Sequence, residues 1–385
     1  MTEPDSTKVA ALARWLVDGA EGAPRPEQVV QTLCERLLAA GVPLDRTAAF
    51  VRTLHPNVLG VRFVWRPGQP VAILHAPRSI LDDAEFLNSP LLPVFDTGQP
   101  LRRRLVDPDC PRDFPILEEF EAEGITDYVV SPLRFLSGEN HVVTWTTKAP
   151  EGFSDADVAA LDAVVPPLAR LAEIYTLGRT AVNLLNVYVG HDAGERILKD
   201  NIRRGETTTL EAAIWLSDLR GFTAFSEMLA PGELIGLLNA TFGAQVPAIE
   251  AHGGQVLKFM GDGVLAIFPA SSGREAACAS ALAAAEEAHA ACAALETIDT
   301  PTRIGVGLHV GPVSYGNIGG ENRLDFTCIG PAVNLAARLQ GLAASEGWSV
   351  ALSEDFATTL PKTPRPLGRF QLKGLPVPVP VFAPG

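Results

Sequence analysis

An aspartate in the second half of the chain stands where an apolar run ends and a helix is expected to begin. Residues 210–217 predict a strand that ends on Asp218, and Phe222 and Thr223 then open a helix with Thr223 as its cap. A carboxylate at this point suits a metal ion that bridges phosphates. The N–H groups of a helix start suit phosphate oxygens, so Phe222 and Thr223 are expected to contact a substrate. The alternative is an aspartate that caps the helix and binds no ligand.

A second aspartate lies in a predicted hairpin turn. Asp262 precedes a glycine, and the apolar runs 255–260 and 264–268 flank this Asp-Gly turn as strands. Taken alone, Asp262 is typical of a turn residue. If the hairpin tip meets the strand that ends on Asp218, the two carboxylates converge and provide the oxygen ligands that magnesium prefers. Paired metals can then activate an attacking hydroxyl and stabilise a leaving phosphate.

An amide and a guanidinium share one face of a helix predicted over residues 333–342. Pro331 stands near the start of this helix, and Asn334 and Arg338 are four residues apart on it. An amide and a guanidinium aimed together at a pocket suit an anionic transition state. An exposed amphipathic helix produces the same spacing, so the pattern leaves both interpretations open.

The elements that must position these side chains belong to the α/β (α+β) class. The other elements expected in this half are a strand at 304–308, a turn-rich hairpin region at 311–320, a strand at 324–329 and an alanine-rich packing helix at 275–295.

The first half of the chain predicts a separate small α+β domain, which we place at residues 1–153. Apolar residues at helical spacing and runs of strand formers alternate with turn signals. The expected elements are helices over 8–40 with a break at 19–26, strands at 46–54, 60–65, 70–75, 127–136 and 140–147, and a short helix near 116–123.

A helical connector, residues 154–205, is expected between this domain and a C-terminal domain over 206–385. Ser154 is placed to cap its first helix. Pro166 and Pro167 are expected to interrupt that helix, so that it is kinked or restarts beyond them.

Composition restricts the partners and the compartment. The 385 residues carry 31 basic and 45 acidic side chains, a net charge of −14, which argues against general nucleic-acid binding. The five scattered cysteines predict free thiols in a reducing compartment. The polar, acidic N-terminus is unlike a secretory signal, and the longest weakly charged stretch, 234–249, is too short to span a membrane. We therefore expect a soluble, cytoplasmic protein.

Residues 25–175 resemble a GAF domain, a common small-molecule sensor module, in strand order and in the helix entry Gly-Phe-Ser-Asp-x-Asp-x-x-x-Leu. The resemblance implies that this domain binds a small molecule, whose identity it does not give. An anionic ligand at Arg102, Arg103 and Arg104 is conceivable, but such a run is more typical of a solvated face. Cys110, a lone loop cysteine, is not expected to anchor a chromophore.

The second half is similar to class III nucleotidyl cyclase catalytic domains, over about residues 207–383. The matching segments, in the order and spacing of that family, are LSDLRGFT, KFMGDGVLAIF, GLHVGPVSYGNIG and DFTCIGPAVNLAARL. The family implies an antiparallel-rich sheet flanked by helices. It also implies a head-to-tail homodimer in which one subunit supplies the aspartates and its partner the other site residues.

Carried over residue by residue, the resemblance implies a role for each matching position. These roles are binding of two Mg²⁺ or Mn²⁺ ions by Asp218 and Asp262, purine contact by Lys258 and Thr327, ribose positioning and transition-state stabilisation by Asn334 and Arg338, and, in a looser register, phosphate binding by Lys373.

Hydrogen-bonding chemistry favours ATP as the substrate. The Lys258 ammonium can only donate and suits adenine N1, whereas the Thr327 hydroxyl can accept from N6. The implied reaction is attack of the 3′-hydroxyl on the α-phosphorus with release of pyrophosphate, giving cyclic AMP. The alternatives are a guanylate or dual-specificity cyclase, and a signalling module that binds nucleotide without turnover.

Overall fold

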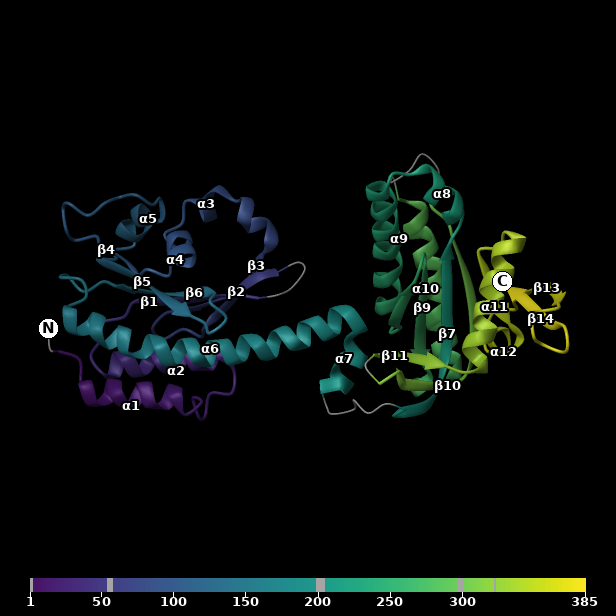
Figure 1. The fold of residues 1–385 in the computed structure, drawn as a ribbon, viewed down its shortest axis with the longest axis horizontal. Helices are drawn as coiled ribbons and strands as arrows, with labels where there is room; N and C mark the ends of the chain where they lie inside the picture. The colour runs from purple at the N-terminus through teal and green to yellow at the C-terminus, as the bar shows by residue number, and fades with distance from the viewer. Residues whose placement is uncertain (1–2, 54–57, 199–204, 296–300, 322) are drawn as a thin grey trace. The chain divides into compact units, whose positions relative to one another are not determined.

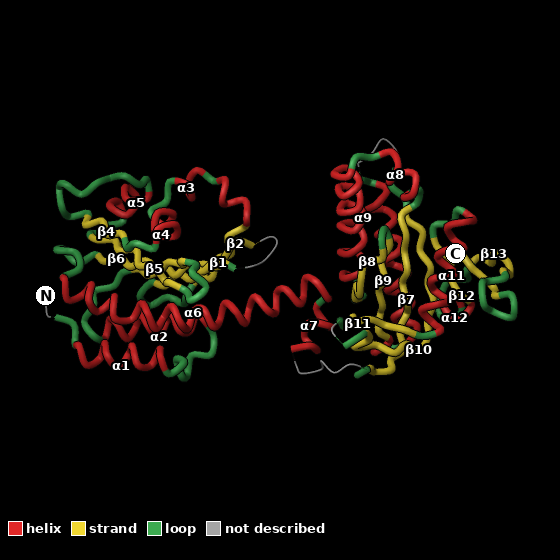
Figure 2. Tube along the Cα trace, viewed as in Figure 1, coloured by secondary structure: helices red, strands yellow, loops and turns green. Residues whose placement is uncertain are grey.

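The computed structural model describes residues 3–53, 58–198, 205–295, 301–321 and 323–385, which form two compact units, Met1–Leu184 and Leu185–Gly385. Each unit is an antiparallel-rich sheet with helices on both faces, which confirms the predicted α/β class (Figures 1 and 2). Within the described ranges, no helix is both long and apolar enough to cross a bilayer. The predicted limits at 153/154 and 205/206 remain predictions, and residues 199–204 of the connector lie outside the described residues.

The sheet of the first unit is wholly antiparallel, with the order β3-β2-β1-β6-β5-β4. Five of its strands confirm predicted ones, and the short β4 was not predicted. The strands are β1 (Arg46–Arg52), β2 (Val58–Trp65), β3 (Ala72–Pro77), β4 (Leu101–Arg104), β5 (Asp127–Arg134) and β6 (Asn140–Thr147).

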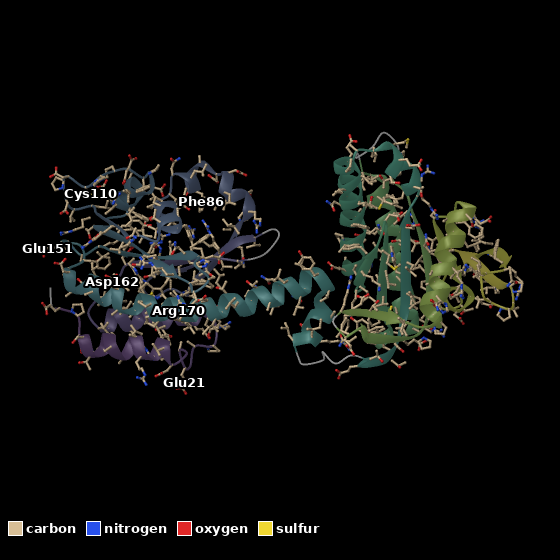
Figure 3. All side chains as sticks on the ribbon, viewed as in Figure 1. Glu21, Phe86, Cys110, Glu151, Asp162 and Arg170 are labelled. Atoms are coloured by element: carbon tan, nitrogen blue, oxygen red, sulfur yellow. The ribbon has the colours of Figure 1, made fainter. Side chains whose placement is uncertain are left out.

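Helices cover both faces of this first sheet (Figure 1). One face packs against α1 (Ser6–Val17), α2 (Pro26–Ala39) and α6 (Asp155–Val189), around Trp65 and Trp145, which are fully buried. The other face lies under shorter helices, α3 (Ala84–Leu87), α4 (Leu91–Thr97) and α5 (Ile116–Ala122), of which only α5 was predicted. Figure 3 labels Phe86 on α3 and Cys110 in the loop before α5.

The predicted restart at Pro166 and Pro167 is wrong, because α6 continues through both prolines as one helix, and the predicted kink stays a prediction. Buried side chains before and after them, including Leu161, Val164 and Leu168, belong to the same core. Tertiary packing therefore holds the helical backbone across the missing N–H groups. The helix starts as predicted: the Ser154 hydroxyl accepts a hydrogen bond from the Asp157 N–H at 3.1 Å.

The arginine run is not the solvated face that was predicted. Arg102 donates to the buried carboxylate of Asp127 at 2.7 Å, and Arg103 pairs with Asp113 at 2.5 Å. The fold therefore uses both guanidinium groups in ion pairs, and Arg104 adds a weaker contact to Asp107 at 3.6 Å.

The sheet of the second unit has the order β13-β14-β12-β10-β7-β9-β8, with β11 paired to β10. Among the described strand pairs of this sheet, only β10 and β12 are parallel. The strands are β7 (Thr207–Leu219), β8 (Gln255–Met260), β9 (Gly263–Pro269), β10 (Ile304–Gly319), β11 (Leu324–Ile329), β12 (Val350–Ser353), β13 (Arg365–Phe370) and β14 (Val379–Ala383).

Two predictions in this unit are wrong. Residues 311–320 do not form a turn-rich hairpin region, because β10 runs through to Gly319, pairing with β7 as far as Gly316 and with β11 from Ser314 onward. Thr223 does not cap its helix, because the N-cap of α8 (Phe222–Met228) is Gly221, which has φ +79°.

Helices flank the second sheet on both faces as well. The alanine-rich α10 (Arg274–Ala293) packs with α9 (Pro231–Ala251) on one face, around the fully buried Trp215. The other face is covered by α11 (Pro331–Glu346), together with α7 (His191–Leu198). The last short helix is α12 (Glu354–Ala357).

Candidate active site

The two predicted metal-binding aspartates lie side by side. In the β7–β9 pairing Ser217 is opposite Val264, so the end of β7 meets the tip of the β8–β9 hairpin. A Cβ at Gly263 would lie 2.3 Å from the Ser217 carbonyl oxygen, so only glycine allows this close approach. The carboxyls of Asp218 and Asp262 consequently lie close enough for each to affect the ionisation of the other.

The pKa of Asp262 is raised to about 6, first by burial and then by the hydrogen bond and negative charge of Asp218. Its own N–H and that of Leu219 oppose part of this shift. Ionising both of two neighbouring carboxyls is unfavourable because their negative charges repel. A cation bound between them would remove this repulsion. The described residues contain no cluster of three or more His, Cys, Asp or Glu side chains that could hold a metal.

A pair of carboxylates nevertheless fits magnesium. Mg²⁺ commonly takes one or two protein carboxylates and completes its octahedron with water and substrate phosphates. The pair Asp218 and Asp262 could therefore hold Mg²⁺ or Mn²⁺ when a nucleotide triphosphate supplies further oxygens.

Arg220 supports the turn that carries Asp218, a role that was not predicted. Its Nη2 donates to the Trp348 carbonyl oxygen at 2.6 Å. Its guanidinium lies against Gly305, where an added Cβ would come within 1.9 Å of it. Burial lowers the pKa of Arg220, and the charge of Asp218 raises it. The arginine inside the segment LSDLRGFT was the available signal.

Lys258 lies on β8 and Thr327 on β11, two strands that do not pair in the sheet but are linked through Asp325. The Lys258 Nζ donates to the Asp325 Oδ2 at 2.8 Å, which joins β8 to β11. Thr327 stands two residues after Asp325 on β11 and is 4% exposed. Among the described residues, its hydroxyl oxygen has no hydrogen-bond partner. Asp325 was not predicted, although two-residue spacing puts it on the same strand face as Thr327.

Asn334 and Arg338 both lie on α11, which packs closely on β10. A Cβ at Gly307 of β10 would lie 2.4 Å from the backbone nitrogen of Gln340, so this glycine sets how close the helix comes. Asn334 is exposed and Arg338 is half-buried. A Cβ at Gly374 would lie 3.4 Å from Nη2 of Arg338, so the loop that contains the exposed Lys373 reaches this guanidinium.

The predicted residues thus fall into two groups within one chain. The first, which we call the carboxylate group, consists of Asp218 and Asp262. The second, which we call the base and ribose group, consists of Lys258, Thr327, Asn334, Arg338 and the Lys373 loop. In the described part of the chain, no hydrogen bond or ion pair joins the two groups. Phe222 and Thr223 lie in the first turn of α8, and their contact with a substrate remains a prediction.

The other singled-out side chains have structural partners. His309 Nδ1 lies 2.8 Å from the Ser353 hydroxyl, and His252 Nε2 lies 2.9 Å from Glu287. All five cysteines are free thiols, and burial raises the pKa of Cys292 and Cys328 to about 11.

Comparison with known proteins gives a family for the second unit. Residues 206–376 match the family model described as adenylate and guanylate cyclase catalytic domain. Adenylate cyclase of Anabaena cylindrica is 32% identical over 176 residues, 42% of this chain and 33% of the relative. Adenylate cyclase 1 of Rhizobium meliloti is 30% identical over 220 residues, 54% of this chain and 33% of the relative. The chain thus spans about a third of the length of these curated relatives.

Solved structures give related matches. The adenylyl cyclase CyaB from P. aeruginosa is 28% identical with a TM-score of 0.42, over 46% of this chain and 94% of that chain. The guanylyl cyclase Cya2 is 30% identical with a TM-score of 0.41, over 46% of this chain and 95% of that chain. On the family model and the curated relatives, residues 206–376 are an adenylate and guanylate cyclase catalytic domain.

Proposed function

We propose that this protein is an adenylate cyclase that converts ATP to 3′,5′-cyclic AMP and pyrophosphate. The observation that carries the proposal is the contact between Asp218 and Asp262 at the meeting point of β7 and the β8–β9 hairpin, within a cyclase catalytic domain. The pair supplies the acidic oxygen ligands that a metal-assisted phosphoryl transfer requires.

The reaction is an intramolecular displacement. The 3′-hydroxyl oxygen attacks the α-phosphorus, the bond from that phosphorus to the bridging oxygen breaks, and pyrophosphate leaves. Two bound Mg²⁺ or Mn²⁺ ions would favour ionisation of the hydroxyl and neutralise charge on the leaving group. Asp218 and Asp262 would hold these ions, Asn334 would orient the ribose, and Arg338 would stabilise the charge on the phosphorus oxygens. Lys373 would bind the terminal phosphates.

Adenine fits the side chains that would read the base. The Thr327 hydroxyl is buried, has no partner within the described chain and can accept from adenine N6. Lys258 can donate to adenine N1 once it releases Asp325. A guanylate or dual-specificity cyclase is the alternative outcome, which competition between ATP and GTP in one assay would reveal.

A homodimer is part of the proposal, because a partner could bring the two groups of site residues together. Large apolar side chains next to the base-reading residues are exposed, namely Phe259 (53%), Met260 (44%), Leu324 (40%) and Ile329 (50%). A head-to-tail dimer would cover such a surface and place the carboxylate group of one subunit against the base and ribose group of its partner.

The helix α6 offers a second contact for the same dimer. Beyond its packing in the first core it exposes an apolar stripe, Ile174, Leu177, Ala181 and Leu184, at alternating spacings of three and four residues. This is the spacing by which two parallel helices pack in a coiled coil.

The first unit is proposed to be a GAF-like sensor domain that regulates the cyclase in response to a small molecule. Its single sheet with helices on both faces supports an independent module, and α6 carries its chain into the second unit. A cytoplasmic location, in keeping with five free cysteines, belongs to the same proposal.

The test is an assay of the purified full chain with ATP and Mg²⁺ or Mn²⁺. We expect cyclic AMP and pyrophosphate in equal amounts, and a loss of roughly 100-fold or more in kcat for Asp218→Asn and for Asp262→Asn. Asp355→Asn, a change at an exposed carboxylate on α12, serves as the matched control. Nucleotide binding without product, with either metal, would instead support the silent signalling module.

A further inference from the structure

The first unit contains a cavity of about 130 Å³ between its sheet and the short helices on that face. The floor is formed by side chains of β1, β2, β5 and β6, including Ala48, Val142 and Thr144. Residues of α5 and of the segment around α3 and α4 line its other side. Figure 1 shows these helices over that face of the sheet. An engineered cavity of about 150 Å³ holds a benzene molecule, so this space is close to the size of one aromatic ring.

Two arginines, Arg46 and Arg62, line this cavity. Within the described residues, neither Arg46 nor Arg62 has an ion pair, and Nε of Arg46 is buried with no hydrogen-bond partner. Neighbouring Arg66 is different, because it pairs with Glu123 at 3.5 Å. Burial and the charges of Arg66 and Arg62 lower the pKa of Arg46. An anion in the cavity would relieve both the missing hydrogen bond and the repulsion.

Other arginines of the first unit show the usual arrangement, in which the guanidinium forms an ion pair. Arg102, Arg103 and Arg112 each hold an aspartate or glutamate side chain. Glu85 and Glu119 also line the cavity, but both are exposed and neither forms an ion pair with an arginine of the described chain. Within the described residues, neither cavity arginine therefore has a carboxylate at ion-pair distance, although Glu123 attracts Arg46 from farther away.

Aromatic side chains surround the same space. Phe50, Phe120 and Tyr128 line it and are nearly fully buried. The Phe120 and Tyr128 rings are 5.1 Å apart, and the Arg46 guanidinium carbon lies 5.6 Å from the centre of the Phe120 ring. Such walls favour a flat apolar group beside the charged one.

We propose that this cavity binds a small aromatic anion, with its carboxylate or phosphate on Arg46 and Arg62 and its ring among Phe50, Phe120 and Tyr128. The inference deepens the proposed sensor role of the first unit by naming the chemical class of its ligand. That such binding regulates the cyclase rests on the proposed function, whereas the binding itself does not.

The test is calorimetric titration of the full chain, without ATP, using benzoate and phenyl phosphate as probes and benzyl alcohol as the neutral comparison. We expect saturable binding of at least one anion and binding of benzyl alcohol at least roughly tenfold weaker. Tighter binding of benzoate would indicate a carboxylate ligand, and tighter binding of phenyl phosphate would indicate a phosphate ligand. Failure of both anions to bind, or equal binding of benzyl alcohol, would overturn the proposal.

Arg46→Met should weaken binding of the anion by roughly tenfold or more, and Arg46→Lys should retain part of it. The matched control is Arg52→Met, because Nε of Arg52 is also buried and unpartnered, while its guanidinium stacks on Phe95 at 4.2 Å outside the cavity. Equal losses in the two methionine variants, with thermal unfolding unchanged, would contradict a role for Arg46 in the site. The titration measures the heat of ligand binding, so the result does not depend on whether the protein has cyclase activity.

Discussion

A buried histidine makes the first unit sensitive to acid. His141 is 1% exposed, its Nδ1 accepts a hydrogen bond from the Arg52 N–H at 3.0 Å, and its ring lies 3.9 Å from that of Phe135. Burial and, to a smaller extent, the charge of Arg52 lower its pKa to about 4, against a partial opposite effect of Glu173. The folded state therefore keeps His141 neutral where the unfolded chain becomes protonated.

We expect the free energy of unfolding to decrease as the pH falls from 6.5 toward 4. Over this range the His141 imidazole binds a proton in the unfolded state but stays neutral in the folded state. The contribution of this group is at most about 1.4 kcal/mol per pH unit. His141→Gln keeps an acceptor for Arg52 and should flatten the decrease, as measured by thermal unfolding at several pH values. His75→Gln, at an exposed position, should leave the decrease unchanged. Parallel curves for wild type and His141→Gln would show that the histidine is not responsible.

If Lys258 reads the base as we propose, the Lys258–Asp325 ion pair must open first, and Asp325 then competes with the substrate. The pair is partly exposed, at 33% and 56% of the two side chains, so it adds at most about 1 kcal/mol. Asp325→Asn should therefore lower KM for ATP by up to roughly fivefold and leave the melting temperature nearly unchanged. Lys258→Met should raise KM instead. Steady-state kinetics gives KM for ATP of both variants. An increase of KM in Asp325→Asn would show that Asp325 assists ATP binding.

At the scale of the elements, the fit of α11 on β10 positions Asn334 and Arg338. A methyl group at Gly307 would lie 2.4 Å from the Gln340 nitrogen and 2.5 Å from the Ala336 carbonyl oxygen, both backbone atoms of the helix. Gly307→Ala must therefore displace α11. We expect a loss of about 1–3 kcal/mol in unfolding free energy and a fall in kcat at saturating ATP.

Gly341 provides the matched control on the same helix, because a Cβ there meets nothing within 4 Å. Gly341→Ala should keep kcat and gain up to about 1 kcal/mol of stability from helix propensity. Chemical denaturation and turnover measured on both variants separate the two cases. Full activity in Gly307→Ala would mean that the spacing of α11 from β10 does not matter for the site.

The elements that the sequence predicted well are those with strong local signals. Alternating apolar residues and an Asp-Gly turn were enough for β8, β9 and the placement of Asp262. The errors arose where tertiary packing overrides local preference, as at Pro166 and Pro167 inside α6. The residues in the region 311–320 favour turns locally. They nevertheless extend β10, because they pair with β7 on one side and with β11 on the other. Asp325 and Arg220 were missed because their partners, Lys258 and Trp348, are distant in the chain.

At the scale of the whole molecule, a net charge of −14 is compatible with an ATP-binding enzyme because the cations are local. Lys258, Arg338 and Lys373 lie in the base and ribose group, and the carboxylate group would carry bound metal ions. The proposed dimer would bring these opposite charges to one substrate. A single subunit, in which no hydrogen bond or ion pair of the described residues joins the two groups, would hold only part of each site.

Complementation between two inactive variants tests this arrangement. Asp218→Asn removes one carboxylate and Arg338→Met removes the guanidinium of the other group, so each homodimer should be inactive. In a symmetric dimer, a mixed pair combines both lesions in one site and leaves the other site intact. With random exchange half of the dimers are mixed, so the mixture should recover about a quarter of wild-type activity. If each chain instead forms its own complete site, mixing restores nothing. The double variant Asp218→Asn/Arg338→Met mixed with either single variant is the control, since no pairing of those chains yields an intact site.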